Sequence, residues 1–280
     1  MEKHIFPHHG NTPVAEIKPL DLLATIQNIE ERGTTEISHR VLQTCSAVFR
    51  YAFVLGKVEY NPATSLQRGI LKAHKAKNYP TIAARQIPAF LKALNDVHAN
   101  PLHKLAIRLL LHTFVRQGEL RRAKWEDIDW KAKEWRLPAA NTKMRVQHLV
   151  PLCRQSIAIL KEVKKLTGTN AHGLLFPSQH LQKNPMMCEN TINNVLKRMG
   201  YKGQLVGHGF RALASTTLHE QGYKPDVIER QLAHKEPNAI RAAYNHAEHL
   251  AERRTMMQAW GDYLDKQAMG GMVVNLKEVG

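Results

Sequence analysis

The chain has 280 residues, 43% of them apolar, and its 40 Lys and Arg outnumber 24 Asp and Glu to give a formal net charge of +16. This length allows one large domain or, more readily, two, and so large a cationic excess favours nucleic acid as the partner over a merely solubilising surface. Three scattered cysteines argue against a disulfide framework or a zinc cluster. No apolar run approaches the roughly 20 residues of a membrane span, and the N-terminus does not resemble a signal peptide. We therefore expect a soluble, cytoplasmic protein.

Residues 1–76 are expected to form a small helical domain. Its first ten residues read as an irregular lead-in, and Asn61-Pro62 begins a third short element. Apolar residues at helical spacing predict helices over residues 20–31 and about 34–55. The buried stripe of the second helix is expected to comprise Val41, Leu42, Cys45, Val48, Phe49, Ala52 and Phe53.

A basic connector is expected to follow this helical domain. Residues 71–85 contain few large apolar side chains, and we assign 77–85 to the linker itself. An extended basic connector would suit a protein that wraps around a duplex, although an ordinary solvated loop has the same composition. The basic side chains expected to contact DNA here are Lys72, Lys75 and Lys77.

Residues 86–268 are expected to form a larger domain, with a C-terminal tail over 269–280. Helical spacing begins at Ile87 and gives way to short alternating runs between residues 125 and 151, which predict a small antiparallel sheet. A turn is expected at 141–144, and helices resume at about residue 154. The predicted fold is therefore mainly α with a small antiparallel β-sheet: a helical segment followed by a mixed α/β domain.

Six side chains in this larger domain could together act on a phosphodiester. Phosphoryl transfer on DNA requires cationic donors for the non-bridging oxygens, a nucleophile, and a proton for the leaving 5′-oxygen. Arginine suits the first task because its planar fork binds two oxygens and keeps its charge. A tyrosine phenol, with a pKa of about 10, needs neighbouring cations and a proton acceptor before it can attack phosphorus. The six are Arg116, Lys143, His208, Arg211, His234 and Tyr244.

Each of these residues also has an ordinary structural interpretation. Arg116 could be a surface arginine paired with a nearby carboxylate, and His234 could cap the helix before it. Lys143 could be a solvated hairpin lysine, and Lys133 or Arg145 could be confused with it. Tyr244 could lie on the buried face of a C-terminal helix. The order of the six residues on a strongly basic chain is what favours the phosphodiester interpretation.

Five motifs, taken together, are more specific than any single residue. They are Thr113-Phe-Val-Arg-Gln-Gly-Glu-Leu120 with Trp125-Glu-Asp-Ile-Asp129; Thr142-Lys143 with His148-Leu-Val-Pro-Leu152; His208-Gly-Phe-Arg211-Ala-Leu-Ala-Ser-Thr216; Asp226-Val-Ile-Glu-Arg-Gln-Leu-Ala-His234; and Arg241-Ala-Ala-Tyr244-Asn245. Over roughly residues 85–265 the chain resembles the tyrosine recombinases, and it is most similar to the integrases of satellite phages and genomic islands.

This resemblance implies site-specific DNA recombination, the integration or excision of a mobile element. Tyr244 would form a 3′-phosphotyrosyl link, and the freed 5′-hydroxyl would attack the partner strand. Since the covalent link conserves the energy of the phosphodiester, neither a cofactor nor a metal would be needed.

The resemblance also implies a role for each polar residue of the site. Arg116 and Arg211 would clamp the scissile phosphate, and Lys143 would be the general acid. His208 would assist with the tyrosine proton, and His234 would stabilise the transition state. Glu119 would support the site structurally.

The partners implied by the resemblance are double-stranded DNA at attachment sites and further copies of the chain, as a tetramer on DNA, with a host DNA-bending factor as an additional candidate. The bound protein would be associated with the nucleoid. Arg145 is expected to contact DNA. Integrases of this type carry an N-terminal arm-binding domain, which this chain is expected to lack, and residues 1–76 are expected to be a shortened core-binding domain.

Three rival interpretations remain. The chain could be a non-catalytic DNA-binding remnant of an integrase, or a type IB topoisomerase-like enzyme that uses the same tyrosine chemistry without pairing two sites. A metal-dependent nuclease would need a carboxylate cluster, and the nearest candidates are Glu126, Asp127 and Asp129. Covalent trapping of DNA separates the enzymes from the remnant, and a requirement for paired sites separates recombinase from topoisomerase.

Overall fold

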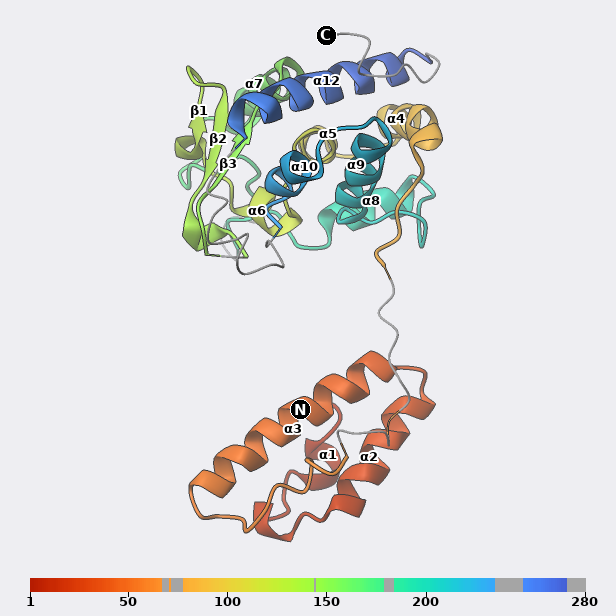
Figure 1. Ribbon diagram of the computed structural model, residues 1–280, viewed down its shortest axis with the longest axis vertical. Coiled ribbons are helices and arrows are strands. Elements are labelled where there is room, and N and C mark those ends of the chain that lie inside the picture. Colours follow the sequence, from red (N-terminus) through yellow and green to blue (C-terminus); the bar gives the residue numbers. More distant parts are fainter. Residues whose placement is uncertain (67–70, 72–77, 144, 179–183, 235–248, 271–280) are drawn as a thin grey trace. The chain divides into compact units, whose positions relative to one another are not determined.

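The computed structural model describes residues 1–66, 71, 78–143, 145–178, 184–234 and 249–270, and the chain divides into two compact units, Met1–Asn78 and Tyr79–Gly280 (Figure 1). Most described residues with regular structure are helical, and the strands form a single small antiparallel sheet. The fold class predicted from the sequence is therefore confirmed. Among the described helices, none combines the length and apolar character needed to cross a bilayer.

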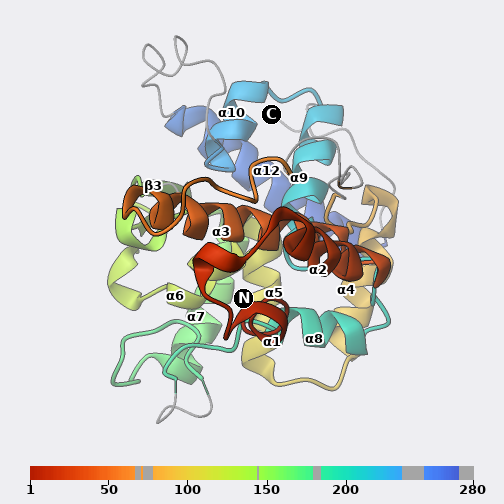
Figure 2. The same ribbon diagram turned by 90° about the horizontal axis from the view of Figure 1, so that it is seen from below.

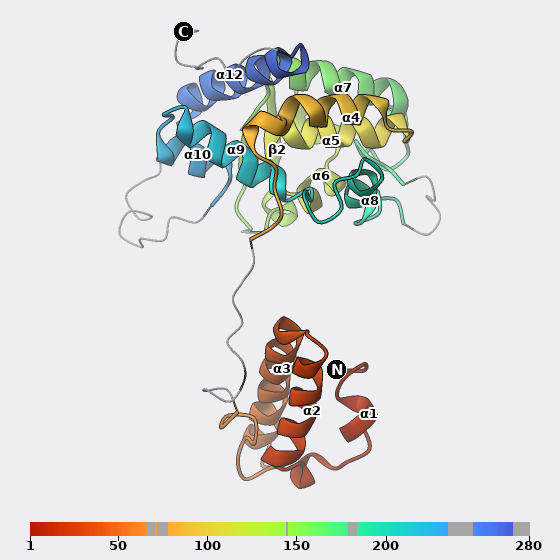
Figure 3. The same ribbon diagram turned by 90° about the vertical axis from the view of Figure 1, so that its right-hand side faces the viewer.

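The first unit is built on a pair of helices, α2 (Pro19–Glu31) and α3 (Thr35–Val54), which follow α1 (Phe6–His9) and the 3-10 turn η1 (Val14–Glu16) (Figures 1 and 3). Pro19 occupies the first turn of α2, where its missing N–H leaves no hydrogen bond unmade. Apolar side chains from both helices meet in one core, which contains Leu22, Ile26, Ile29, Val41, Leu42, Cys45 and Phe49.

The first unit differs from the sequence-based prediction in three places. The lead-in contains the short helix α1, because Ile5 is buried in the core and draws the N-terminus onto it. The segment after Asn61 forms turns instead of a third regular element. Val48 and Phe53 are 47% and 52% exposed, not buried. Phe49 and Ala52, which lie between them in the sequence, are buried, so Val48 and Phe53 lie beside the buried face of α3 rather than on it.

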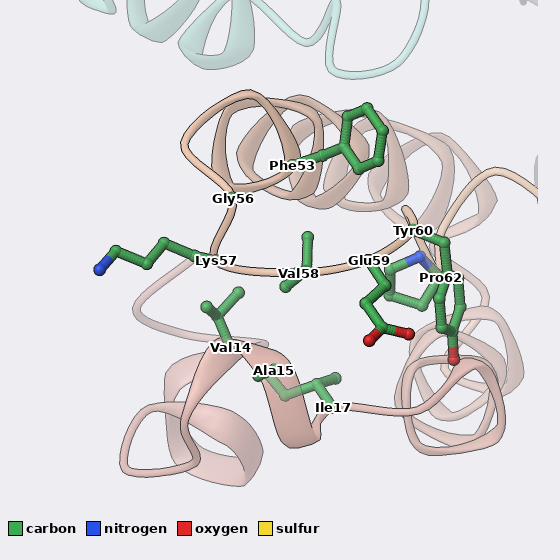
Figure 4. Close-up of a pocket in the computed structure, with 10 residues that line it drawn as sticks. All are labelled: Val14, Ala15, Ile17, Phe53, Gly56, Lys57, Val58, Glu59, Tyr60 and Pro62. Carbon is green, nitrogen blue, oxygen red and sulfur yellow. The ribbon is translucent and has the colours of Figure 1, made fainter.

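Phe53 instead lines a pocket of about 620 Å³ beside the C-terminal end of α3 (Figure 4). The opposite wall comes from η1 and the residues next to it, and the floor from the chain that leaves α3. The lining residues are Val14, Ala15, Ile17, Phe53, Gly56, Lys57, Val58, Glu59, Tyr60 and Pro62.

The second unit contains the sheet and the remaining described helices. The strands pair in the order β1–β2–β3, both pairs antiparallel, with Trp135 of the middle strand opposite Ile128 and Val150. The elements are η2 (Ala84–Gln86), α4 (Ile87–Asp96), α5 (Pro101–Thr113), α6 (Gln117–Arg122), η3 (Trp125–Asp127), β1 (Ile128–Asp129), β2 (Glu134–Leu137), η4 (Ala139–Asn141), β3 (His148–Pro151), α7 (Arg154–Thr167), α8 (Thr191–Arg198), α9 (Gly209–Glu220), α10 (Pro225–Gln231) and α12 (Leu250–Ala268).

Helix α5 lies in the middle of this unit and contacts α6, α7, α8, α9 and α12. Asn100 caps its N-terminus by accepting a hydrogen bond from Leu102 N at 2.8 Å. Helix α12 lies beside α10 and covers α5, α7 and β3 (Figures 2 and 3). Met257 and Leu264 of α12 are buried in the core of their own unit.

Part of the predicted linker belongs to the second unit. Thr81 donates its hydroxyl to Gly209 O at 2.8 Å, Ile82 is buried in the core, and the Tyr79 ring lies 4.4 Å from the imidazole of His208. Residues 79–85, which were predicted to be part of the linker, therefore belong to the second unit. No periodicity marks this attachment in the sequence, because the segment is fixed by single contacts rather than by a buried face.

Candidate active site

The first guanidinium of the site is held by the turn between α5 and α6. Arg116 immediately precedes α6, and Glu119 accepts hydrogen bonds from its backbone N at 2.8 Å and from Nη1 at 2.9 Å. The Glu119 side chain is buried, while that of Arg116 retains partial exposure. Nη2 of Arg116 donates to Ala233 O at 3.1 Å. The pairing with a carboxylate that could have made Arg116 an ordinary surface residue instead fixes its orientation.

The second guanidinium is buried and anchored on two main-chain carbonyls. Arg211, in the first turn of α9, is 5% exposed, and its Nη1 and Nη2 donate to Phe114 O and Leu232 O, each at 2.5 Å. Within the described residues its Nε has no hydrogen-bond partner. Burial, followed by the charge of Arg116, lowers the pKa of Arg211 to about 10, so the side chain remains cationic at neutral pH.

Two of the residues whose carbonyls accept hydrogen bonds from the arginines, Phe114 and Ala233, have left-handed backbone. Phe114 ends α5 with a φ of 60°, and Ala233 follows α10 with a φ of 48°. A non-glycine residue in this region costs roughly 1–2 kcal/mol, and such strain concentrates at functional sites. Phe114 is held there by its buried ring, which meets Trp260 edge to face with the centroids 5.5 Å apart.

His208 is half-buried among the cations of the site. Burial lowers the pKa of His208 below its ordinary value, and the positive charges of Arg211, Arg116, His234 and Lys143 lower it further. The imidazole is therefore neutral at pH 7 and can accept a proton. These interactions also show that the structure brings together five of the six side chains singled out in the sequence.

Two glycines frame His208 because other groups approach the chain closely on both sides. A Cβ on Gly207 would lie 2.2 Å from the side-chain amide of Gln117, whose oxygen accepts from Gly207 N at 3.3 Å and from His208 N at 3.1 Å. A Cβ on Gly209 would lie 2.2 Å from Pro80 O. At Gly209 the close atom is a main-chain oxygen, so only glycine fits there, whereas at Gly207 a Cβ would displace the Gln117 side chain. Gln117 is a residue of the site that the sequence did not reveal.

Lys143 lies in a turn between β2 and β3, as predicted, and its side chain is exposed. The hydroxyl of Thr142 closes this turn, since it donates to Val146 O at 2.8 Å and accepts from Val146 N at 3.2 Å. Arg122 of α6 donates to Asn141 O at 2.9 Å. The turn with the lysine is thus tied to the same short helix that Arg116 precedes.

His234 follows the C-terminus of α10 and is oriented by a carboxylate. Its Nδ1 lies 2.6 Å from Oε2 of Glu229. An ionised carboxylate only accepts, so Nδ1 carries the hydrogen and Nε2 is left for a further partner. This bond ties the ring to the preceding helix through a side chain and leaves Nε2 at the opposite edge of the ring.

Some predicted residues cannot be placed in the site. Tyr244 lies outside the residues that the structure describes, and so do the predicted DNA contacts Lys72, Lys75 and Lys77. Arg145 is exposed in the same turn as Lys143, with a φ of 53°. Its contact with DNA stays a prediction.

The three carboxylates considered for a metal site have local partners. Asp127 accepts from Lys124 N at 2.9 Å, and Glu126 pairs with the Lys124 ammonium at 3.1 Å. Asp129 pairs with Arg136 at 3.0 Å. Across the part of the chain that the structure describes, no three His, Cys, Asp or Glu side chains are grouped so that they could hold a metal ion.

One buried histidine, His148, was not singled out as an individual residue from the sequence. His148, at the start of β3, is 7% exposed, and its Nε2 donates to Gln231 O at 3.1 Å. Burial, followed by the charge of Arg253, lowers the pKa of His148 to about 3. The motif containing His148 was visible in the sequence, but its alternating pattern could not show that the ring reaches a helix 83 residues away.

The neutral state of His148 predicts a loss of stability in acid. Between pH 6.5 and about 3 the unfolded chain binds a proton that the folded protein does not, so this residue lowers the free energy of unfolding by about 1.4 kcal/mol per pH unit, with no contribution above pH 6.5. Urea unfolding at pH 6.5 and 5.0 can be followed by tryptophan fluorescence, because all four tryptophans lie in the second unit. We expect wild type to lose roughly 2 kcal/mol more than His148→Gln over this interval. Equal losses in the two proteins would contradict a neutral, buried His148.

Comparison with known proteins assigns both units. Residues 80–250 match the phage integrase family, and residues 1–69 match the phage integrase central domain. The chain belongs to the phage integrase family. It is 40% identical to the integrase of Enterobacteria phage P4 over 95% of its own length, and it spans 63% of that relative. All six candidate residues lie within residues 80–250.

Solved structures of integrases share the fold of this family member. A lambda integrase dimer bound to a COC′ core site aligns with a TM-score of 0.64 at 19% identity, over 88% of this chain and 86% of that one. A lambda integrase tetramer bound to a Holliday junction aligns with a TM-score of 0.66 at 18% identity, over 85% and 70% of the two chains. The integrase fold therefore extends over both units.

Proposed function

We propose that this integrase-family chain is a tyrosine-type site-specific DNA recombinase that cleaves and rejoins DNA through a 3′-phosphotyrosyl intermediate, in the integration or excision of a mobile element. The observation that carries the proposal is the cluster of Arg116, Lys143, His208, Arg211 and His234: the other four side chains all act on the His208 imidazole, and Arg116 also acts on Arg211. A concentration of cations around a neutral histidine suits a phosphodiester, whose negative charge the arginines can bind.

The distribution of charge supports DNA as the substrate. The second unit has 30 Lys and Arg against 17 Asp and Glu, whereas residues 1–78 have ten against seven. Most of the net charge of +16 therefore belongs to the unit that contains the cluster. Such an excess attracts duplex DNA by releasing its counterions, independently of sequence.

The two arginines are assigned to the scissile phosphate. Their guanidinium groups are already oriented by Glu119 and by main-chain carbonyls, so little reorganisation is required when charge develops on the non-bridging oxygens. His208 is assigned to the proton of Tyr244, because a neutral imidazole can accept it as the phenol oxygen attacks phosphorus.

The leaving group needs a proton in the same step. As the bond between phosphorus and the 5′-oxygen breaks, Lys143 donates a proton to that oxygen, and a 5′-hydroxyl is released. Nε2 of His234 donates to a phosphate oxygen when the ring is protonated. Rejoining reverses the step, because the 5′-hydroxyl of the partner strand attacks phosphorus and the tyrosine leaves with a proton.

The proposed partners are duplex DNA at attachment sites and further copies of the chain. Lambda integrase has been solved as a tetramer bound to a Holliday junction, and we extend that assembly to this protein. A host DNA-bending factor is a further proposed partner, and the proposed location is the cytoplasm, at the nucleoid.

The test is covalent trapping on a nicked duplex that spans the attachment site of the element encoding this chain. The protein is incubated with the duplex in EDTA, and a denaturing gel is examined for a protein–DNA adduct. We expect an adduct to accumulate, because the fragment beyond the nick diffuses away and rejoining cannot occur. Tight DNA binding without an adduct would support the non-catalytic remnant, and efficient relaxation of supercoils lacking a second site would support a topoisomerase-like enzyme.

A further inference from the structure

A buried group of polar side chains lies where several segments of the site meet. We call Gln231, Arg253 and His148 the polar junction. They come from the last turn of α10, the first turn of α12 and the first residue of β3, and they are 1%, 1% and 7% exposed. Burying an amide, a cation and an imidazole is costly unless each is hydrogen-bonded.

Gln231 is the centre of the polar junction. Its Nε2 donates to Thr113 O at 3.1 Å, and its Oε1 accepts from Nε and Nη2 of Arg253 at 3.1 and 2.8 Å. Its main-chain oxygen accepts from His148 Nε2 at 3.1 Å. Arg253 also donates from Nη2 to Leu149 O. The two side chains and the imidazole thus connect α5, α10, α12 and β3.

Each connection reaches a segment that carries a group of the proposed reaction. Thr113 ends α5, three residues before Arg116, and β3 follows the turn that holds Lys143. Gln231 directly precedes the two carbonyls that anchor the arginines, and His234 comes three residues after it. Helix α12 begins directly after the stretch of chain that includes Tyr244.

We propose that Arg253, Gln231 and His148 are positioning residues of this reaction: they hold the strand that follows Lys143 in register with the carbonyls that aim the two arginines. The inference rests on the proposed function. None of the three is proposed to contact DNA, because all are buried. They act on the reaction by fixing the distance between the general acid, Lys143, and the phosphate.

A purely stabilising role would not require these residue types. Apolar side chains already hold α12 on its own unit, among them Met256, Met257 and Trp260, each fully buried. Replacing buried polar groups by apolar ones of similar volume often leaves stability unchanged or increases it, whereas satisfied polar networks restrict the packing to one arrangement. The amide of Gln231 uses both its donor and its acceptor, which fixes its orientation.

The test compares two leaving groups. Arg253→Met removes every donor at similar volume, and Arg254→Met is the matched control on the same helix, because Arg254 ties α12 to Ala132 O at 2.9 Å and Glu134 at 2.5 Å, at the other end of the sheet. One nicked duplex carries the ordinary 5′-oxygen at the scissile phosphate, and the other carries sulfur. A thiolate, with a conjugate acid of pKa about 8.5, leaves without a general acid.

For Arg253→Met we expect adduct formation to slow on the order of 100-fold with the oxygen substrate, because a displacement of about 1 Å is enough for such a loss. With the sulfur substrate the rate should return to within about threefold of wild type, since the step no longer needs Lys143. Arg254→Met should match wild type on both substrates. Equal slowing on both substrates, or the same slowing in Arg254→Met, would overturn the inference.

A second pair of variants tests the junction without changing its arginine. His148→Gln keeps a donor that can reach Gln231 O, and His148→Leu removes it. We expect slowing with the oxygen substrate in His148→Leu alone, and equal rates in the pair would overturn the inference, as would a failure of the sulfur substrate to rescue His148→Leu. Tryptophan fluorescence checks that each variant is folded. A wild-type protein that forms no adduct with either substrate would instead overturn the proposed function, on which this inference depends.

Discussion

Replacing Tyr244 with phenylalanine is expected to abolish the covalent protein–DNA adduct while leaving DNA affinity within about twofold of wild type. The substitution removes only the oxygen that would attack phosphorus, and the cations proposed to bind the phosphate remain around His208. The measurements are a denaturing gel of the nicked duplex for the adduct and fluorescence anisotropy of the intact duplex, at one fixed salt concentration, for affinity.

The matched control is Tyr263→Phe. Tyr263 is fully buried in α12, and within the described residues its hydroxyl has no hydrogen-bond partner, so we expect the adduct to form as in wild type. An adduct that persists in Tyr244→Phe would place the nucleophile elsewhere. The next phenol to test would then be Tyr79, whose ring lies 4.4 Å from His208.

Replacing Arg211 with lysine is expected to slow adduct formation by roughly 10²–10³-fold, the usual effect of removing one preorganised donor from a developing oxyanion. The guanidinium spans Phe114 O and Leu232 O while keeping Nε within the site. An ammonium is a single point of charge and cannot hold both carbonyls and a phosphate oxygen in one fixed geometry. The rate is measured from single-turnover accumulation of the adduct.

Arg121→Lys is the matched control for this substitution. Arg121 also donates to a main-chain carbonyl, with its Nε 2.6 Å from Met187 O, and among the described residues no hydrogen bond or ion pair joins it to a proposed catalytic group. We expect its adduct rate to stay within about threefold of wild type, as for substitutions outside the preorganised site. A thermal melt of both variants separates a lost catalytic donor from unfolding, because leaving buried carbonyls unpaired costs about 1–3 kcal/mol. Similar rates for Arg211→Lys and wild type would exclude Arg211 from the phosphate.

Much of the fold follows from local sequence patterns. Helix α5 was predictable because its apolar residues recur at helical spacing, and the sheet was predictable because short apolar runs occur at residues 135–137 and 149–151 on either side of a turn. The exposed Val48 and Phe53 were not, since the pattern shows that a face is apolar but not how wide its buried part is. The attachment of residues 79–85 depends on contacts with a segment more than 120 residues away.

The site could be predicted only as a set of side chains in order. Arginine, lysine and histidine at the motif positions indicated the chemistry, and the structure gathers five of these residues. The groups that orient them left little signal. Arg253 reads as one of two adjacent basic residues on a helix, and only the structure shows that it is buried while Arg254 is not. Gln231 lies inside a quoted motif, but nothing local shows that its amide bridges two helices.

The carbonyls that hold Arg116 and Arg211 belong to the main chain, and every amino acid carries one. What natural selection must preserve at Phe114 and Ala233 is therefore a backbone angle, not a functional group. Sequence motifs show the arginines but not the main-chain carbonyls that accept their hydrogen bonds. Two relatives could differ at both positions and keep the same clamp, and a third could keep every catalytic residue and lose it through one altered turn.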